Sequence, residues 1–250
     1  MENKNGNGIF LGVVSVATLI VAIIGATFAY FSVSISSNEG AVNLAAYEFN
    51  AGISVSQIYP SAATALIPLD PDAGIEGAAG SSTTNLLYAL NTADTRCVDD
   101  NGYQVCALYQ VTVTNNASGA LTLDGVIRTV SNVAGSRADA VPFADLTYQG
   151  VTGELNALQL SGTATTLGTD ADDTVSIGTI TVPGATTDGE NTTPGTYSTY
   201  VAIYLNENGD QSAQMGATYS GQIVYTSSSG NGSALTGTFV VGNGGSGGNG

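Results

Sequence analysis

The stretch that decides the fold class is QVCALYQVTVT, residues 104–114. From Tyr109 onward it alternates between apolar and polar residues, which is the period of a β-strand with one face buried. Segments of similar composition, rich in Val, Ile, Thr and Tyr, recur along the chain at residues 42–49, 53–58, 85–90, 120–130, 174–182, 195–205, 220–226 and 235–241. Gly, Asn, Asp, Pro and Ser separate them. The sequence therefore predicts an all-β protein, an antiparallel sandwich of the jelly-roll or Ig-like kind.

The rest of the chain adds little regular structure to this prediction. Residues 141–160 could hold one short helix, and residues 60–82, with three of the six prolines, read as a long loop or insertion. No internal repeat or sharp boundary divides the β-rich part. We expect one extracellular domain, residues 30–241, and a flexible Gly/Asn/Ser tail at residues 242–250.

The N-terminal segment predicts export. Residues 9–31 read IFLGVVSVATLIVAIIGATFAYF, about 23 residues and long enough to cross a bilayer of roughly 30 Å as a helix. The run also fits a long signal-peptide core, because Thr27 and Ala29 are tolerable residues for cleavage between Ala29 and Tyr30. Residues 1–29 are thus predicted to be a signal peptide or a membrane anchor. We expect a secreted, extracellular or cell-surface protein, which contacts a membrane only through residues 9–31 if these are retained.

Composition excludes several functional classes. The chain has 20 acidic and 4 basic residues, no His and no Trp, and its formal net charge is −16. Such a charge repels nucleic acid. Without His, the usual Ser-His-Asp and Cys-His sites and His-ligated zinc are impossible, and with Lys4 as the only lysine the extracellular part has no Schiff-base lysine. A paired-carboxylate glycosidase is conceivable, but sugar clefts usually recruit Trp. We expect no enzymatic activity and no cofactor.

The two cysteines lie in RCVDDNGYQVC, residues 96–106. Asp, Asn and Gly between them suit a tight turn. We predict that a disulfide between Cys97 and Cys106 closes the base of this hairpin, since the compartment is oxidising.

Acidic pairs in predicted loops are the only candidates for metal binding. They are Asp99 and Asp100; Asp170, Asp172 and Asp173; Asp70 and Asp72; and Glu207 and Asp210 in the stretch 206–210. Calcium requires several oxygen ligands, and none of these loops has the spacing of an EF-hand. Solvated loops are the default interpretation, and a calcium site is the alternative.

Two further patterns concern the surface. Tyr197, Tyr200 and Tyr204 fall on one predicted strand, where they suit either the edge of a core or a contact between subunits. Asn-x-Ser/Thr sequons, the acceptor pattern for N-glycosylation, begin at Asn116, Asn191 and Asn231. Such short patterns also arise by chance in a chain rich in Ser and Thr.

Directly after the predicted cleavage site, Phe31, Val33 and Ile35 alternate with serines as in a half-buried strand. A strand at a mature N-terminus can pair within its own domain or insert into a neighbour's sheet. The surrounding stretch GATFAYFSVSISSNEGAVNL resembles the processing region of the TasA/camelysin family of matrix fibre proteins, which a SipW-type signal peptidase cleaves. Residues 111–121 and 218–225 look similar to that family as well.

The resemblance implies a secreted structural subunit of a cell-surface or extracellular-matrix fibre. Its copies would form a non-covalent homopolymer by donor-strand complementation, with residues 30–36 completing the sheet of the next subunit. The chain departs from the family in being nearly free of lysine, in its cysteine hairpin and in its Gly/Asn tail. Two competing hypotheses are a type IV pilin-like subunit that retains its apolar helix, and a monomeric surface adhesion or binding module.

Overall fold

The computed structural model describes residues 50–60, 66–71, 85–92, 96–99, 101–228 and 234–242. The chain divides into two compact units, residues 1–39 and 40–250, and every described residue belongs to the second unit. Among these residues no helix is both long and apolar enough to cross a membrane. The predicted export segment, residues 9–31, and the predicted strand at residues 42–49 lie outside the described residues.

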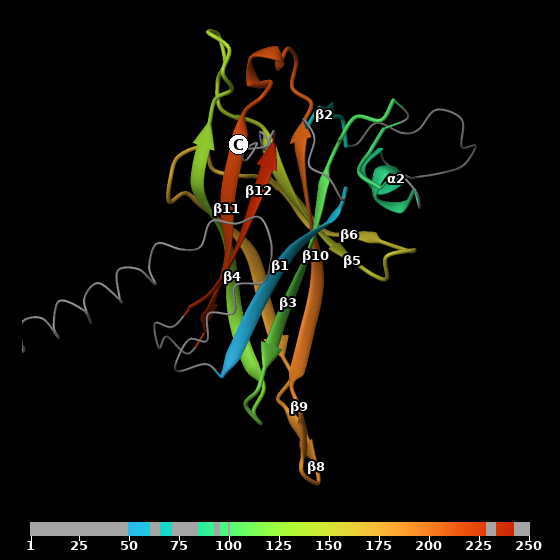
Figure 1. Cartoon of the computed structure of the whole chain (residues 1–250), viewed down its shortest axis with the longest axis vertical. Coiled ribbons are helices and arrows are strands. Elements are labelled where there is room, and N and C mark those ends of the chain that lie inside the picture. Colours follow the sequence, from blue (N-terminus) through green and yellow to red (C-terminus); the bar gives the residue numbers. More distant parts are fainter. Residues whose placement is uncertain are drawn as a thin grey trace, which may run out of the picture. The chain divides into compact units, whose positions relative to one another are not determined.

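Two antiparallel sheets pack face to face as a β-sandwich (Figure 1). The first sheet has the order β1-β3-β10-β5-β6, with β2 added in parallel to the end of β10. Its strands are β1 (Ala51–Tyr59), β2 (Pro68–Leu69), β3 (Ala107–Asn115), β5 (Leu146–Thr152), β6 (Gln159–Thr166) and β10 (Gly195–Asn206). The second sheet has the order β12-β11-β4-β7 and consists of β4 (Leu121–Val133), β7 (Thr174–Val182), β11 (Thr218–Ser227) and β12 (Ala234–Gly242).

Alternation along the strands builds the core between the sheets. In β3, Tyr109, Val111 and Val113 are buried, and the residues between them face outward. Leu123, Ile127, Tyr219, Ile223 and Leu235 face them from the second sheet, all almost inaccessible to water. Burial of each such aliphatic side chain contributes about 1.5–3 kcal/mol. The predicted all-β sandwich is confirmed at this level.

A second core covers one end of the outer face of the first sheet, and we call it the outer core. It contains Leu86, Ala89 and Leu90 of helix α2 (Asn85–Asn91), the two cysteines, and Leu108, Val151, Leu158, Ala202 and Tyr204. The prediction of a strand at residues 85–90 is therefore wrong. Leu86, Ala89 and Leu90 have the spacing i, i+3, i+4, which places them on one face of a helix, and that face packs on the sheet.

The interpretation of residues 141–160 as a short helix is also wrong. β5 and the start of β6 occupy this range, because Leu146, Tyr148 and Val151 lie on a strand that pairs with β10. The expected loop at residues 60–82 contains the two residues of β2, and only residues 66–71 of its interior are described. The remaining elements are the hairpin β8 (Thr186–Asp188) and β9 (Asn191–Thr193) and a short 3₁₀ helix, η1 (Ser212–Gln214).

Candidate functional site

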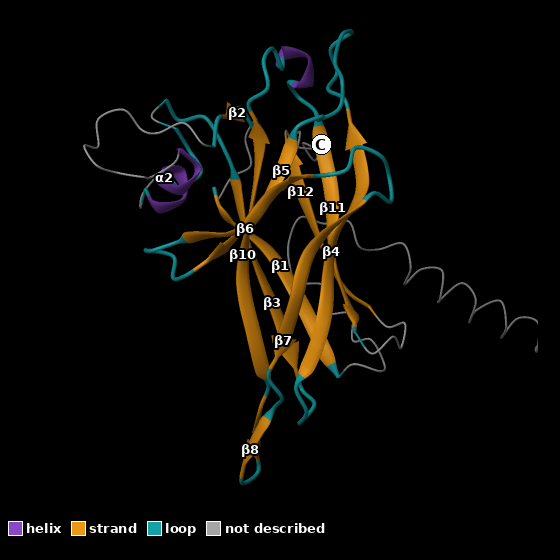
Figure 2. Ribbon diagram, turned by 180° about the vertical axis from the view of Figure 1, so that it is seen from behind, coloured by secondary structure: helices purple, strands orange, loops and turns teal. Residues whose placement is uncertain are grey.

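The two sides of the sandwich, where the edges of the two sheets meet, are closed to different degrees. On one side, which we call the closed seam, β1 and β12 lie against each other (Figure 2). The Tyr109 hydroxyl donates a hydrogen bond of 2.6 Å to the Val240 carbonyl across this seam. A Cβ atom at Gly237 would lie 2.3 Å from Cγ2 of Val55, so only glycine lets β12 approach β1 so closely. β1 and β12 therefore lie too close together for a strand to fit between them, although each of them also pairs on one side only among the described strands.

On the other side, which we call the open seam, the edge strands are β6 and β7. Each pairs on one side only among the described strands, β6 with β5 and β7 with β4. All eight residues of β6 are exposed. Each strand therefore has a free edge, a row of backbone N–H and C=O groups available to a further strand.

Between these free edges lies a cleft of about 250 Å³, which we call the seam cleft. Its lining residues come from β5, β6, β7, β10 and β11, and the apolar and aromatic ones are Tyr148, Val151, Ile177, Ile180, Tyr197, Tyr200, Val201 and Tyr225. Serines and threonines supply most of the polar lining. None of the described residues that line it is acidic, basic or a cysteine. The cleft can thus accept hydrogen bonds and apolar side chains but presents no ionised group.

Two phenols of the seam cleft have raised pKa values. Burial, followed by the neighbouring Tyr197 and Tyr148, raises the pKa of Tyr225. Burial and then Tyr197 also raise the pKa of Tyr148. These two phenols stay protonated at neutral pH, so each can donate a hydrogen bond into the cleft as well as accept one.

The local sequence explains how β6 and β7 are placed. Gln149 of β5 is buried, and its side-chain nitrogen donates to the Ser161 carbonyl at 2.8 Å. A Cβ at Gly150 would come within 2.7 Å of that same carbonyl oxygen, so glycine permits the close approach of β6. On β7, Ile177 is an extra residue relative to β4, and Gly178 beside it has φ +90°. This bulge changes the direction in which the middle of the free edge of β7 points.

The sequence-predicted donor strand and cleavage site cannot be placed relative to this cleft. Ala29, Tyr30, Phe31, Val33 and Ile35 all lie outside the described residues.

Strand alternation places the three tyrosines of β10 on two different faces of the first sheet. Tyr197 faces the core and the cleft, Tyr204 is buried in the outer core, and Tyr200 is half-buried at its edge. Both the core-edge and the contact interpretations stay open for Tyr197.

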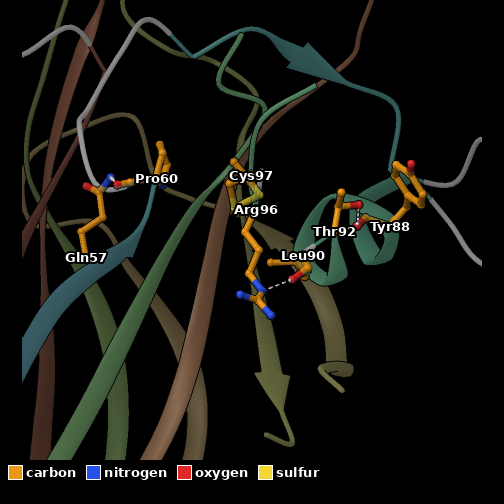
Figure 3. The surroundings of a disulfide bond; sticks show 8 residues. Gln57, Pro60, Tyr88, Leu90, Thr92, Arg96 and Cys97 are labelled. Atoms are coloured by element: carbon orange, nitrogen blue, oxygen red, sulfur yellow. Dashed lines mark hydrogen bonds between the residues drawn. A yellow bond between two sulfur atoms is a disulfide. The ribbon is translucent and has the colours of Figure 1, made fainter. Parts of the chain in front are cut away.

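The disulfide prediction is confirmed. Cys97 and Cys106 are joined, and Val105 N–H donates to the Cys97 carbonyl, so the bond closes a hairpin as expected. Next to it, the buried guanidinium of Arg96 donates to the Leu90 carbonyl (Figure 3). It also donates to the Leu155 carbonyl and stacks over the ring of Tyr59. This arginine ties α2, the β5–β6 connection and the end of β1 together, which is a structural role.

Aspartates of the acidic loops accept hydrogen bonds from backbone N–H groups of their own loops. Asp99 accepts hydrogen bonds from the backbone N–H groups of Asn101 and Tyr103, and Asp173 accepts one from Asp170. Asp172 has φ +70° in the same turn as Asp173, and Asp100 lies outside the described residues. In the part of the chain that the structure describes, no three acidic, His or Cys side chains gather in a way that could hold a metal ion. Calcium binding stays a prediction.

Sequence reasoning missed the seam cleft. Tyr148, Ile177 and Tyr225 come from β5, β7 and β11, which are far apart in the chain, and only the strand order brings them together. One partial signal existed: β7 alternates Val175, Ile180 and Val182 with threonines, yet Gly178 interrupts the pattern. A glycine inside a strand pattern indicates a bulge or a close approach.

Comparisons with known proteins assign no family. No protein-family model matches this sequence, and no curated protein does. The fold is similar to the crystal structure of a FixG-related protein from Vibrio parahaemolyticus, at 11% identity and a TM-score of 0.33, over 78% of this chain and 96% of that one. It is also similar to a family 123 glycoside hydrolase from Clostridium perfringens, at 10% identity and a TM-score of 0.23, over 55% of this chain and 21% of that one. Both likenesses are too distant to carry an argument.

Proposed function

We propose that this protein is a secreted structural subunit of a cell-surface or extracellular-matrix fibre, as its resemblance to the TasA/camelysin family implies. In this proposal, residues 30–36 of one copy occupy the open seam of the next copy. The sandwich would then be completed as a jelly roll by a strand from a neighbour. The observation that supports the proposal most directly is the open seam itself, where β6 and β7 present free edges on either side of a cleft.

The chemistry of the seam cleft suits a strand with the pattern of residues 30–36. β7 turns Val175, Ile180 and Val182 toward the core and threonines toward solvent. A strand paired with its free edge would continue that division, with Phe31, Val33 and Ile35 against the core and the serines outside. The phenols of Tyr148 and Tyr225 offer neutral hydrogen-bonding groups. An uncharged cleft also accepts the uncharged side chains of this strand without burying an unpaired charge.

The test compares the full chain with a variant that carries Phe31→Ser, Val33→Ser and Ile35→Ser. A matched control carries Ser32→Thr, Ser34→Thr and Ser36→Thr, which leaves the apolar face intact. Negative-stain electron microscopy and light scattering should find fibres for the wild type and the control, and monomers for the serine variant. Fibres from the serine variant would sink the proposal.

A complementation experiment tests whether residues 30–36 occupy the seam cleft, and it does not require fibres to form. A synthetic peptide of residues 30–36 is added to the serine variant, whose own strand no longer competes. At a hundredfold excess over its Kd the peptide should stabilise the protein by about 2.7 kcal/mol. A peptide of the same composition in scrambled order should not. An unchanged melting temperature with both peptides would contradict occupation of the cleft.

The first residue of the exported protein separates the fibre hypothesis from the pilin-like one. Tyr30 at the N-terminus is expected here, because only cleavage after Ala29 frees the strand. A terminus near Ile9 would mean that the apolar helix is retained.

A monomeric binding module is the second candidate function, and the aromatic lining of the seam cleft is the observation that favours it. Tyr148 and Tyr197, both half-buried in the cleft, are the kind of side chains that small polar ligands contact. Under this hypothesis the wild type stays monomeric at high concentration, and the peptide of residues 30–36 leaves its stability unchanged.

A further inference from the structure

Two connections touch at one end of the sandwich, which we call the sequon pole. They are the β3–β4 turn, residues 116–120, and the β7–β10 connection, residues 183–194, which includes the β8–β9 hairpin. The Ala185 N–H donates to the Ala117 carbonyl at 2.7 Å. A Cβ at Gly184 would lie 2.1 Å from the Ser118 carbonyl oxygen, so glycine allows the two connections to touch. Figure 1 shows the hairpin projecting from this end.

Side-chain hydrogen bonds from the buried residue Asn115 hold the β3–β4 turn in place. Asn115 is 1% exposed, and its side-chain nitrogen donates to the carbonyls of Gly119 and Pro183. Its side-chain oxygen accepts from the Ala117 N–H. The next residue, Asn116, is exposed and opens the sequon Asn116-Ala117-Ser118. Of these two neighbouring asparagines, Asn115 therefore fixes the turn, and Asn116 is exposed to solvent on it.

The second sequon, Asn191-Thr192-Thr193, forms strand β9. Residues two apart on a strand share a face, so the amide of Asn191 and the hydroxyl of Thr193 lie on the same side of the hairpin. Every residue from Thr186 to Pro194 is exposed. Within the described part of the chain, neither Asn116 nor Asn191 makes a side-chain hydrogen bond, and neither Ser118 nor Thr193 does. Both amides and both hydroxyls are therefore free to meet an enzyme.

We propose that Asn116 and Asn191 are acceptors for N-linked glycans, so that the sequon pole carries two oligosaccharides. This inference does not depend on the proposed fibre function. It rests on the position of both sequons on exposed, touching connections, with acceptor and hydroxyl accessible together. Asn231 lies outside the described residues and takes no part in it.

The covalent step requires a lipid-linked oligosaccharide as co-substrate and a transferase on the extracellular side of the membrane. The side-chain nitrogen of asparagine forms a bond to the anomeric carbon of the first sugar. The bond from that carbon to the pyrophosphate oxygen breaks, the lipid pyrophosphate leaves, and the amide gives up one proton. The hydroxyl two residues on is the part of the pattern that the enzyme reads.

The test measures peptide masses of the full-length protein recovered from the cells that produce it. The peptides containing Asn116 and Asn191 should each be heavier than their sequence by one glycan and should yield sugar fragment ions. The same chain made in a bacterial strain without an oligosaccharyltransferase should have the unmodified masses.

Substitutions separate acceptor chemistry from any structural effect. Thr193→Ala should remove the glycan at Asn191, and Ser118→Ala the one at Asn116, although both asparagines remain. Thr192→Ala, equally exposed but in the unread middle position, should leave the glycan in place. Circular dichroism should be unchanged in all three variants, because exposed residues are replaced. Unmodified masses at both asparagines in the native protein would overturn the proposal, and so would a glycan that survives Thr193→Ala.

Discussion

All four edge strands pair on one side only, but β1 and β12 are in direct contact along the closed seam, whereas β6 and β7 lie on either side of the seam cleft along the open seam. The same kinds of residue line both sides: tyrosines, β-branched residues and a few glycines. The difference lies in what each glycine accommodates. Gly237 admits a neighbouring side chain, while Gly178 allows a bulge that turns the edge. The closed seam should therefore contribute to stability, and the open seam to association.

The largest expected effect is at the closed seam. Phe239 is 4% exposed, and its ring centroid lies 5.3 Å from that of Tyr109 and 6.0 Å from that of Tyr219. Phe239→Ala should lower the free energy of unfolding by about 3–5 kcal/mol, because it leaves a cavity among these rings. Tyr197→Ala at the open seam should cost less than half as much, since Tyr197 is only half-buried. Urea denaturation of both variants measures the difference, and equal losses would contradict the distinction between the seams.

A smaller effect tests the fit of β12 against β1. Gly237→Ala places a methyl group 2.3 Å from Val55 Cγ2 and should cost about 1–3 kcal/mol. Val55→Ala in the same chain makes room, so the double variant should recover part of that loss. Gly119→Ala is the control, because a Cβ at Gly119 meets nothing within 4 Å. If Gly237→Ala and Gly119→Ala are equally stable, the close contact between β12 and β1 does not require a glycine at position 237.

Parts of this architecture could be predicted from the sequence. The alternation in β3 and β7 decided the fold class, because one face of each strand is buried and the other is solvated. The same reasoning failed for residues 85–90, where a run of only six residues fits a strand or a helix until its packing partner is known. It also missed β6, which is exposed on both faces and so has no alternation to detect.

The site was less predictable than the fold. Cys97 and Cys106 are close in the sequence, so the turn residues between them sufficed to predict the disulfide. The seam cleft depends instead on which strands end up at the sheet edges. That order is set by pairings between distant segments, such as β4 with β11 and β3 with β10, and no local pattern encodes it.

Alkaline pH should affect buried phenols at both seams. Burial raises the pKa of Tyr109 at the closed seam and of Tyr225 at the open seam above the value in the unfolded chain, about 10. The unfolded chain loses these protons first, so the contribution of these phenols to stability is constant below about pH 10 and falls above it. Each phenol contributes about 1.4 kcal/mol per pH unit. In Tyr109→Phe the free energy of unfolding should fall less steeply above pH 10, by about 1.4 kcal/mol per pH unit. Urea denaturation at a series of pH values measures this slope.

Tyr109→Phe also removes the hydrogen bond to Val240, which should cost about 1 kcal/mol at neutral pH. A slope that does not change in this variant would mean that Tyr109 ionises equally easily in the folded and unfolded chains.

The smallest expected effect on stability is at the free edge of β7. Ile177 is half-buried and lies at the bulge, so Ile177→Asp should lower the free energy of unfolding of the monomer by only about 1 kcal/mol. The same carboxylate would face an incoming strand and lose its water when that strand docks, which is costly for an unpaired charge. Assembly into fibres should therefore stop, whereas Ile177→Val should assemble as the wild type does. Electron microscopy and urea denaturation on the same samples measure both quantities. If Ile177→Asp still formed fibres, strand docking at β7 would be excluded; if it unfolded as readily as Phe239→Ala, the open seam would have to be counted as part of the stabilising core.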